Sequence, residues 1–557
     1  MNDAQPTAPS RVRGWVARTG PGTILFAAAA LLSGVLLLHF MSRQTFWRDE
    51  WDFLLHRRGW GLDTFFHPFV EQLLAIPVLI YRVLQSTFGM DSPVPYQLVA
   101  VLLFVLSVVM LFVYARRRMG EWLALAVTLP ILFLGPSWDD LLFPFQMALF
   151  GSIVCGIGAL LVLERRDRTG DIVAMVLLIV CLFFFDLGVA FVAGATVELA
   201  FGRDRFRRAY VVAVPTFLWL LWYAGWGHEA ETFISLKNFA YAPSYIADGL
   251  ASSIATLVGL GSINFNAPRS PLEWGRPLLV LAAVVFGWRL YRLGRISDRL
   301  AATLAILLGF WFLSGLNTNP LAPAEVGRYQ YIGIILLVLV IAELMRGVVV
   351  GRIATAIVVF VGVTAALANA PELFDASDGI ADQSVREKGG LAALELARDQ
   401  VDPNLQLTEE NSDVNYLLLL DAGDYLSAVD AYGSPAYSPE ELASAPEPAR
   451  VAADKVSGAA LRLGLSPAPG GRTGPCVTRT LSEGHPATAP GGVIMRSPGP
   501  GIQVALRRYA TESFPLALGT LTPGRPELIQ IPIDRSTRIW TIQLSGTGAV
   551  DVCDRAP

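Results

Sequence analysis

Long apolar runs that return again and again along the chain limit its possible folds more than any other feature. They recur from Thr23 to Asn369, and several are long enough to cross a bilayer. Hydrophobic residues make up 53% of the 557 residues and charged residues only 16%. The sequence therefore predicts an α-helical polytopic membrane protein.

Arginine clusters between these runs predict the topology, because arginine in short loops stays in the cytoplasm. Arg11, Arg13 and Arg18 precede the first run and place the N-terminus inside. Threading spans between the later clusters gives about eleven transmembrane helices, and the odd number places the C-terminus outside. The later clusters are Arg116–Arg118, Arg165–Arg168, Arg203–Arg208, Arg289–Arg299 and Arg346 with Arg352, and the spans are 22–41, 96–115, 121–135, 147–163, 172–187, 188–201, 209–226, 276–291, 300–316, 329–346 and 353–369.

Two further apolar stretches are left out of this count, because including them would move arginine clusters to the wrong side. The stretch Phe69 to Phe88 contains Glu71, Pro77 and Arg82, and is predicted to lie in the outer interface. The small-residue-rich stretch Tyr245 to Gly261 is interpreted in the same way. Both would flank a site on the outer face.

The composition predicts four regions along the chain. Residues 1–20 form a cytoplasmic tail, 21–370 the transmembrane domain, 371–465 an external, mainly helical segment, and 466–557 an external β-rich module. Alternating runs at 502–506, 528–533 and 539–544 predict a small β-sandwich in the last region.

The cysteines fall into two groups. Cys155 and Cys181 lie in predicted spans and are interpreted as packing residues. Cys476 and Cys553 lie near the two ends of the β-rich module, where an oxidising compartment would allow a disulfide, although spacing alone does not fix that pairing. The five histidines show no metal-ligand spacing, which argues against a zinc site.

An acidic and aromatic motif, Trp47-Arg-Asp-Glu-Trp-Asp52, follows the first predicted span. Carboxylates just outside a membrane span usually have a function or a partner, because charge near hydrocarbon is costly. Asp49 and Glu50 are therefore candidates for a general base that activates a hydroxyl. For Asp52, an ordinary ion pair with a nearby arginine is an equally good interpretation.

A second acidic motif, Trp138-Asp139-Asp140, lies in the next predicted outer loop. A carboxylate there, or Asp52 or Glu71, would orient an acceptor or hold a divalent cation such as Mg²⁺ or Mn²⁺. Asp139 and Asp140 would equally serve as helix caps. The aromatic residues would offer flat surfaces to sugar rings, or would act as interfacial anchors.

Arg328, beside Tyr329, departs from the arginine-inside pattern, because it stands at the outer start of a predicted span. Arginine binds phosphate well, so Arg328 is a candidate ligand for a lipid phosphate. The alternatives are snorkelling or an ion pair with Glu325. Asp186 falls at another outer turn and suits either a helix cap or a site wall.

Together, Asp49-Glu50 after span one, Val70-Glu71-Gln72, Trp138-Asp139-Asp140, Arg328-Tyr329 and an external C-terminal module resemble the GT-C superfamily of integral-membrane glycosyltransferases. The two acidic motifs are also similar to uncharacterised multi-pass proteins of high-GC Gram-positive bacteria. The resemblance covers residues 20–370 in layout, but only short motifs in letters.

The resemblance implies a polyprenyl-phosphate-linked sugar donor, inverting transfer, and an envelope glycan, glycolipid or protein as acceptor on the outer face of the bacterial plasma membrane. An acidic residue of the first loop would act as the base, which maps onto Asp49 or Glu50. Glu71 is followed by Gln72, where the family pattern leads us to expect histidine. No cofactor is expected beyond a divalent cation such as Mg²⁺ or Mn²⁺, and no residue is assigned as a resident metal ligand. The mixed net charge of -4 does not suggest nucleic acid as a partner.

A non-enzymatic lipid or glycan transporter, or a scaffold of an envelope-assembly complex, is the alternative. Transporters typically carry polar residues at the bilayer midplane. Here the predicted spans are almost free of charge at mid-depth, and the polar residues gather at the outer ends. That distribution favours chemistry at the outer interface.

Overall fold

The computed structural model describes residues 20–555 apart from 203, 262, 265–266, 269, 321, 415–419, 469–472 and 481–490. The predicted tail with Arg11, Arg13 and Arg18 lies outside these residues, apart from position 20, and so does His485. The chain divides into two compact units that are each discontinuous in sequence. Unit 1 comprises Met1–Met41, Gly59–Ile80 and Tyr96–Asp378, and unit 2 comprises Ser42–Arg58, Tyr81–Pro95 and Gly379–Pro557.

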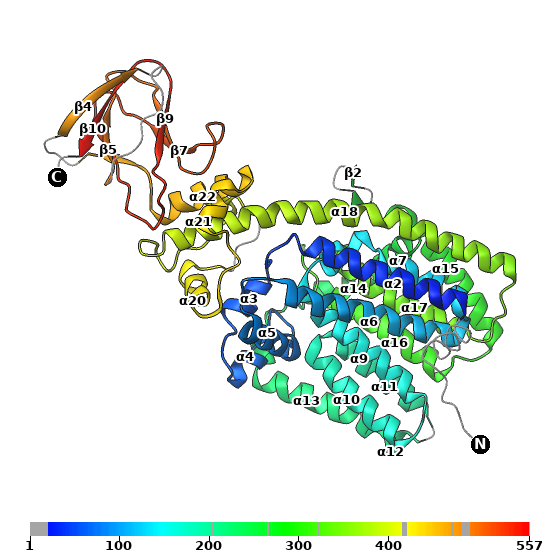
Figure 1. Cartoon of the computed structure of the whole chain (residues 1–557). Helices are drawn as coiled ribbons and strands as arrows, with labels where there is room; N and C mark the ends of the chain where they lie inside the picture. The colour runs from blue at the N-terminus through cyan, green and yellow to red at the C-terminus, as the bar shows by residue number, and fades with distance from the viewer. Residues whose placement is uncertain are drawn as a thin grey trace, which may run out of the picture. The chain divides into compact units, whose positions relative to one another are not determined.

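Unit 1 is a bundle of helices (Figure 1). Neighbouring helices in the sequence pack as hairpins, for example α9 with α10 and α14 with α15, and α11 packs against the distant α16. The helices are α2 (Pro21–Met41), α4 (Leu62–Phe66), α6 (Val94–Met119), α7 (Glu121–Leu132), α8 (Trp138–Leu141), α9 (Met147–Leu163), α10 (Arg168–Phe184), α11 (Leu187–Phe201), α12 (Arg205–Arg208), α13 (Tyr210–Gly225), α14 (Leu236–Leu257), α15 (Leu272–Leu293), α16 (Asp298–Leu316), α17 (Gly327–Leu344) and the first part of α18 (Arg352–Leu396).

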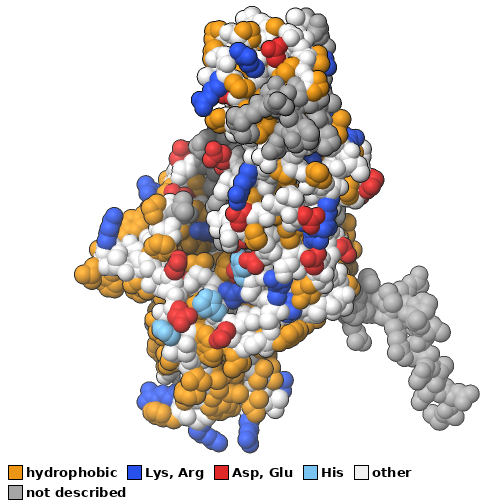
Figure 2. Space-filling view, turned by 90° about the vertical axis from the view of Figure 1, so that its left-hand side faces the viewer, with side chains coloured by type: hydrophobic (Ala, Val, Ile, Leu, Met, Phe, Trp, Pro, Cys, Tyr) orange, Lys and Arg blue, Asp and Glu red, His pale blue; other side chains and the backbone are white. Residues whose placement is uncertain are grey.

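Six helices among the described residues are long and apolar enough to cross a membrane, and a seventh span exists if α7 and the bent segment Gly135–Leu141 count as one. The protein is thus a mostly helical, multi-pass membrane protein. Figure 2 shows a broad patch of hydrophobic side chains toward the lower end of one face. The six are α2, α6, the segment Pro144–Leu163, α16, α17 and α18.

The count of about eleven spans stays a prediction. The other predicted spans are present as helices, but α11 and α13 have only 15 and 16 residues. A helix rises 1.5 Å per residue, so these would need a thinned bilayer or extra turns to cross about 30 Å of hydrocarbon. The 22-residue α15 is long enough, but it carries charged residues near both ends, including Glu273 and Arg292.

The stretch Tyr245 to Gly261 is predicted to lie in the outer interface, but it packs within the helix bundle. Most of it belongs to the 22-residue α14, which packs against α15, α16 and α17. Its small residues form a buried face: a Cβ added to Gly249 would lie 2.4 Å from the Trp311 ring, and Ser253 lies against Gly333. Small residues let helix backbones approach closely, so this pattern indicated a packed helix.

The predicted domain boundary at 370–371 falls inside α18. This helix has 45 residues and continues through Pro371, and only its last part belongs to unit 2. The change in composition at Pro371 thus occurs within one continuous helix, and the two units divide between Asp378 and Gly379.

Unit 2 combines helices with two antiparallel sheets. Its helices are α3 (Glu50–Leu55), most of α5 (Ala75–Phe88), α19 (Glu409–Ser412), α20 (Ala422–Tyr432), α21 (Pro439–Ser444) and α22 (Glu447–Ala460). One sheet has the order β3-β8-β5-β10-β4 and the other β7-β6-β9. The strands are β3 (Leu465–Pro467), β4 (Thr473–Thr480), β5 (Val493–Arg496), β6 (Gln503–Arg507), β7 (Leu516–Thr520), β8 (Glu527–Ile529), β9 (Thr541–Ser545) and β10 (Ala549–Arg555).

A single apolar cluster joins the two sheets, which confirms the predicted β-rich region at the C-terminus. Met495 and Ile529 come from the larger sheet, and Leu506 and Ile542 from the smaller one. Cys476 and Cys553 face each other across β4 and β10 and form a disulfide. Cys155 and Cys181 are free and buried among the helices, as packing residues would be.

Candidate functional site

Glu71 lies at the tip of a tight turn in unit 1. Phe69 and Gln72 exchange two backbone hydrogen bonds of 3.1 and 2.9 Å, which leaves Val70 and Glu71 as the two tip residues. Val70 has a φ of 54°, a left-handed conformation that β-branched residues rarely adopt. Backbone strain of this kind persists only where the surrounding structure imposes it, often at functional sites.

The surroundings of Glu71 change its acidity. Burial raises the pKa of this carboxyl above its usual range, although a hydrogen bond from its own backbone, the Asn317 side chain and the charge of Arg328 partly offset the effect. Asn317 follows the last residue of α16, and Arg328 is the second residue of α17. Glu71 is therefore a carboxyl of raised pKa beside a cation.

Asp186 is a second carboxyl next to this turn. It precedes α11, and its Oδ1 accepts a hydrogen bond from the Leu73 backbone N–H at 3.3 Å. Burial raises the pKa of Asp186 to about 7, and the negative charge of Glu71 contributes in the same direction. Two neighbouring carboxyls with raised pKa values are typical of sites that move protons.

Arg328 is exposed and lies within electrostatic reach of two acidic residues from different segments, Glu71 and Asp140. Its guanidinium carbon lies 5.3 Å from the centre of the Tyr329 ring. Tyr329 in turn forms side-chain hydrogen bonds with Arg328 and Tyr245. The arginine is therefore oriented by an aromatic neighbour while its surface remains accessible.

The second acidic motif is docked on the start of α17. The Ser137 hydroxyl donates a hydrogen bond of 2.7 Å to the Gly327 carbonyl. A Cβ at Gly327 would lie 2.0 Å from the Pro136 carbonyl oxygen, so only glycine permits this close approach. This contact fixes Trp138, Asp139 and Asp140 on α8 beside Arg328.

The three residues of this motif differ in burial and in their contacts. Asp140 is 1% exposed, and its Oδ2 has no hydrogen-bond donor among the described residues. Asp139 is half-buried and acts on Asp140 through its charge. The Trp138 ring meets the Phe143 ring edge-on at 5.9 Å. Neither aspartate is the N-cap of α8, because that position belongs to Ser137.

Glu50, in unit 2, is held very differently. Its side chain is fully buried and accepts hydrogen bonds from the Tyr81 hydroxyl at 2.7 Å and the Trp47 backbone N–H at 2.9 Å. Burial raises the pKa of Glu50 to about 8 in spite of these bonds, and the charge of Asp49 adds to the rise. Glu50 is thus mostly protonated at neutral pH, while Asp49 beside it is half-buried.

Asp52 forms the ion pair that the sequence left open. It accepts from Arg57 Nε at 2.8 Å and lies 3.1 Å from His56 Nδ1. Burial alone would raise the pKa of Asp52, but these two partners lower it below its usual range. Asp52 is therefore a charged residue of α3 that pairs with Arg57 and His56.

The structure separates the predicted site residues into two groups. Glu71, Asp139, Asp140, Arg328 and Tyr329 lie together in unit 1, whereas Asp49, Glu50 and Asp52 belong to unit 2. Two further residues adjoin the unit 1 group and have no role in the chemistry that the sequence predicts. From the sequence, Asp186 suits either a cap or a site wall, and Asn317 carries no signal beyond its place in the same loop as Arg328.

One group of residues in unit 2 could hold a metal ion, although the histidine spacing gave no sign of it. His56, Asp421 and Asp424 offer ligand atoms within 4.8 Å of one another, and His56 Nε2 lies 3.5 Å from Asp424 Oδ2. An imidazole with two carboxylates is a donor set that divalent transition metals accept. The ligands come from distant parts of the chain, so no sequence motif marks them.

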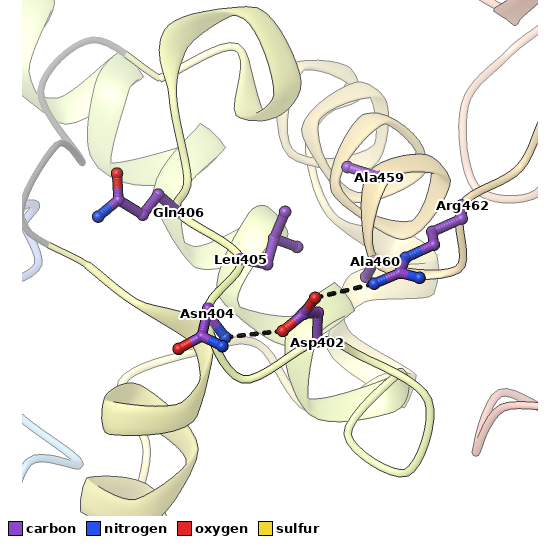
Figure 3. Close-up of a pocket in the computed structure, with 7 residues that line it drawn as sticks. All are labelled: Asp402, Asn404, Leu405, Gln406, Ala459, Ala460 and Arg462. Atoms are coloured by element: carbon purple, nitrogen blue, oxygen red, sulfur yellow. Dashed lines mark hydrogen bonds and ion pairs between the residues drawn. The ribbon is translucent and has the colours of Figure 1, made fainter.

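A pocket of about 340 Å³ also lies in unit 2 (Figure 3). Its acidic group is already paired, because Asp402 accepts hydrogen bonds from the Asn404 backbone N–H at 3.0 Å and from Arg462 at 2.8 Å. The other lining residues offer no acid or base, so we assign no chemistry to this pocket. They are Leu405, Gln406, Ala459 and Ala460.

Neither a protein-family model nor a curated protein matches the chain. Among solved structures, the chain is similar to ArnT from Cupriavidus metallidurans bound to undecaprenyl phosphate, with a TM-score of 0.43 and 13% sequence identity. The alignment covers 76% of this chain and 89% of that chain. A likeness at this level assigns neither a family nor a function.

Proposed function

We propose that the protein is a membrane glycosyltransferase of the GT-C type, which moves a sugar from a polyprenyl-phosphate donor to an envelope glycan, glycolipid or protein. The observation that carries this proposal is the convergence of Glu71 and Asp140 on the exposed Arg328 at the start of a membrane helix. An exposed guanidinium at the end of a membrane helix suits the binding of a lipid-linked phosphate, and the neighbouring carboxyls suit proton transfer.

The reaction divides between these groups. The acceptor hydroxyl attacks the anomeric carbon as its proton passes to a carboxylate, and the bond between that carbon and the phosphate oxygen breaks. The polyprenyl phosphate leaves with the bonding electron pair, and Arg328 offsets the charge that develops on it. Attack opposite the leaving phosphate inverts the anomeric configuration.

Within unit 1, Glu71 is our candidate for the group that takes the proton. A general base works best when its pKa lies near the working pH, and burial moves the pKa of Glu71 in that direction. The strained turn at Val70 and the Asn317 side chain hold the carboxyl in place. Asp186, with a pKa of about 7, is a neighbouring group that can exchange a proton in the same pH range.

The sequence predicts a second candidate base in the first loop, Asp49 or Glu50. Because burial raises the pKa of Glu50 to about 8, Glu50 is mostly protonated at neutral pH, and Asp49 is the member of this pair that we carry forward as a base. The two candidate bases, Asp49 and Glu71, make separate predictions and are tested side by side.

The test is sugar transfer by purified protein in lipid, from a panel of radiolabelled polyprenyl-phosphate sugars to envelope glycolipid acceptors. We expect Arg328→Gln to lower turnover about 100-fold, as loss of one transition-state donor does elsewhere. The matched control is Arg276→Gln, because Arg276 is exposed and pairs with Asp248 at 3.0 Å. Glu71→Gln and Asp49→Asn then identify the base by which of them abolishes transfer.

Two results would count against this function. Full transfer by Arg328→Gln would remove its central residue. No turnover with any donor, together with retained binding of polyprenyl phosphate, would favour the transporter or scaffold alternative. Extracytoplasmic placement of Arg328 is tested separately, by labelling a cysteine introduced at Glu325, in the loop before α17, with an impermeant thiol reagent in intact cells.

A further inference from the structure

A polar pocket of about 350 Å³ lies in unit 1, away from the Arg328 cluster along the same helices. It forms where α6, α9, α11 and α17 end and α16 begins. Its lining is unusual because every side chain is charged. The lining residues are Arg117, Arg118, Glu164, Arg166, Glu198, Asp298, Arg299 and Arg346.

Two arginines form a fixed inner wall. The Arg118 side chain is 3% exposed, forms ion pairs with Glu343 and Glu164, and lies 3.4 Å from the centre of the Tyr114 ring. The Arg299 side chain is 8% exposed, pairs with Glu198 at 2.9 Å, and donates to the Leu160 carbonyl at 2.6 Å. These guanidinium groups are already oriented before any ligand arrives.

Three arginines form a looser outer rim. Arg117 and Arg166 reach carboxylates only at 3.6 and 3.9 Å, and their side chains are largely exposed. Arg346 is exposed, and the described residues include no carboxylate paired with it. Exposed pairs at such distances contribute little to stability, so these side chains can exchange partners for a ligand.

The charges of the pocket do not balance. Five arginines face three carboxylates among the lining residues, so the lining has a positive excess. Glu343, which pairs with Arg118 behind the wall, reduces that excess but does not remove it. Glu198 Oε2 and Glu343 Oε2 are buried and have no hydrogen-bond donor among the described residues. An anion that also carries a hydroxyl or amine would balance the excess positive charge and donate hydrogen bonds to these carboxylate oxygens.

We infer that this pocket binds the phosphate of an anionic phospholipid headgroup. Basic pockets between transmembrane helices commonly bind such headgroups. The helices α16 and α17 lead from Asp298 and Arg346 to Asn317 and Arg328, and the 18 residues of α17 span about 27 Å. The pocket and the Arg328 cluster therefore lie about one hydrocarbon thickness apart. The pocket lies on the opposite face of the membrane from the proposed reaction.

The test titrates detergent-purified protein with phosphatidylglycerol or phosphatidylcholine and follows retained lipid by native mass spectrometry and the melting temperature. We expect phosphatidylglycerol to bind and stabilise, and phosphatidylcholine to do neither. The double variant Arg117→Gln, Arg346→Gln should weaken the apparent affinity by about tenfold to thirtyfold, since each arginine near an anionic lipid contributes about fivefold. Both residues lie on the outer rim, so the fold is retained.

The matched control is the double variant Arg292→Gln, Arg295→Gln, which removes two exposed arginines that do not line the pocket. Equal loss of binding in both double variants, or no loss in either, would overturn the inference. If inorganic phosphate competes as well as the lipid does, the ligand of this pocket would instead be a small soluble phosphate compound. Sugar transfer is measured on the same samples, so failure of this site is separable from failure at Arg328.

Discussion

Glu50 and Glu71 both have raised pKa values, but the structure holds them in opposite ways. Glu50 is fully buried, and two donors in its own unit satisfy its oxygens. Glu71 is only partly buried, stands on a strained turn and has an exposed cation as a neighbour. The difference teaches that a raised pKa alone does not mark a catalytic group. A buried, satisfied acid supports the fold, whereas a partly open one beside an exposed cation is available for chemistry.

The largest effect should come from removing the buried acid. Glu50→Ala leaves the Tyr81 hydroxyl and the Trp47 N–H without their acceptor and opens a cavity, so we expect it to cost about 3 kcal/mol. Glu50→Gln keeps the shape and mimics the protonated acid, and should cost less than about 1 kcal/mol. Chemical unfolding at pH 7 measures both. A Gln variant as unstable as the Ala variant would mean that Glu50 is ionised in the folded protein.

The pH dependence of stability at Asp186 offers a second test of how burial raises a pKa. Its pKa of about 7 in the folded protein lies above the usual 3.8, so the folded state holds a proton that the unfolded state releases. The stability from this group is complete below pH 4 and is lost as the pH rises through 7. We expect Asp186→Asn to flatten the fall in melting temperature between pH 5 and pH 8. If the slope of melting temperature against pH does not change, another group is responsible for this pH dependence. The same measurement on Glu50→Gln tests the raised pKa in unit 2.

Val70 tests whether the turn under Glu71 is strained. Val70→Gly relieves the left-handed backbone of an exposed residue and should stabilise the protein by about 1 kcal/mol. Val70→Ala, which removes the branched side chain but keeps a Cβ, serves as the control and should gain less. If neither variant changes the melting temperature, the turn carries no strain, and the rigid placement of Glu71 needs another cause.

The smallest effect is expected at His56. Asp52 and the more distant Asp424 and Asp421 raise the pKa of His56, so its contribution is present below pH 6.5 and is lost as the pH rises through its folded pKa. The side chain is 37% exposed, and water screens the pair. We therefore expect His56→Gln to cost below about 1 kcal/mol at pH 5.5 and nothing measurable at pH 8.5. His67→Gln is the control, since His67 Nδ1 lies 3.4 Å from Glu229 and the His67 side chain is more exposed.

The class of the fold followed from the sequence, because the free energy of placing apolar runs in lipid is large and additive along each helix. The strands of the C-terminal region followed from their alternation, as β6 and β9 show. The ends of the spans could not be predicted from the sequence. For example, Pro130 and the bend before Gly135 divide one apolar run into two helices. After the bend, Gly135 packs so closely that a Cβ built on it would lie 2.0 Å from the Asn369 carbonyl oxygen. No local sequence pattern indicates such an approach.

The candidate site could be predicted only in part, because the sequence shows which residues are charged but not which of them meet. Acidic residues at the ends of apolar runs were visible as candidates, and Arg328 was visible because it broke the arginine rule. Which of them meet depends on tertiary packing. Asn317 reaches Glu71 across more than two hundred residues, and the first-loop acids join a unit built mainly from the last third of the chain. Burial, which sets the acidity of Glu50 and Asp186, is a property of that packing and of no local motif.

The make-up of unit 2 has a consequence for synthesis of the protein. Trp51 Nε1 donates a hydrogen bond of 2.7 Å to Glu387, 336 residues later in the chain. At about 5 to 20 residues per second, a ribosome needs roughly 20 to 70 seconds to supply that partner. During this interval Trp51 lacks both this partner and the ring of Tyr425, which it meets edge-on at 5.8 Å in the finished protein. Nascent protein stalled before residue 379 should therefore be a substrate for membrane chaperones and proteases, whichever reaction the finished protein performs.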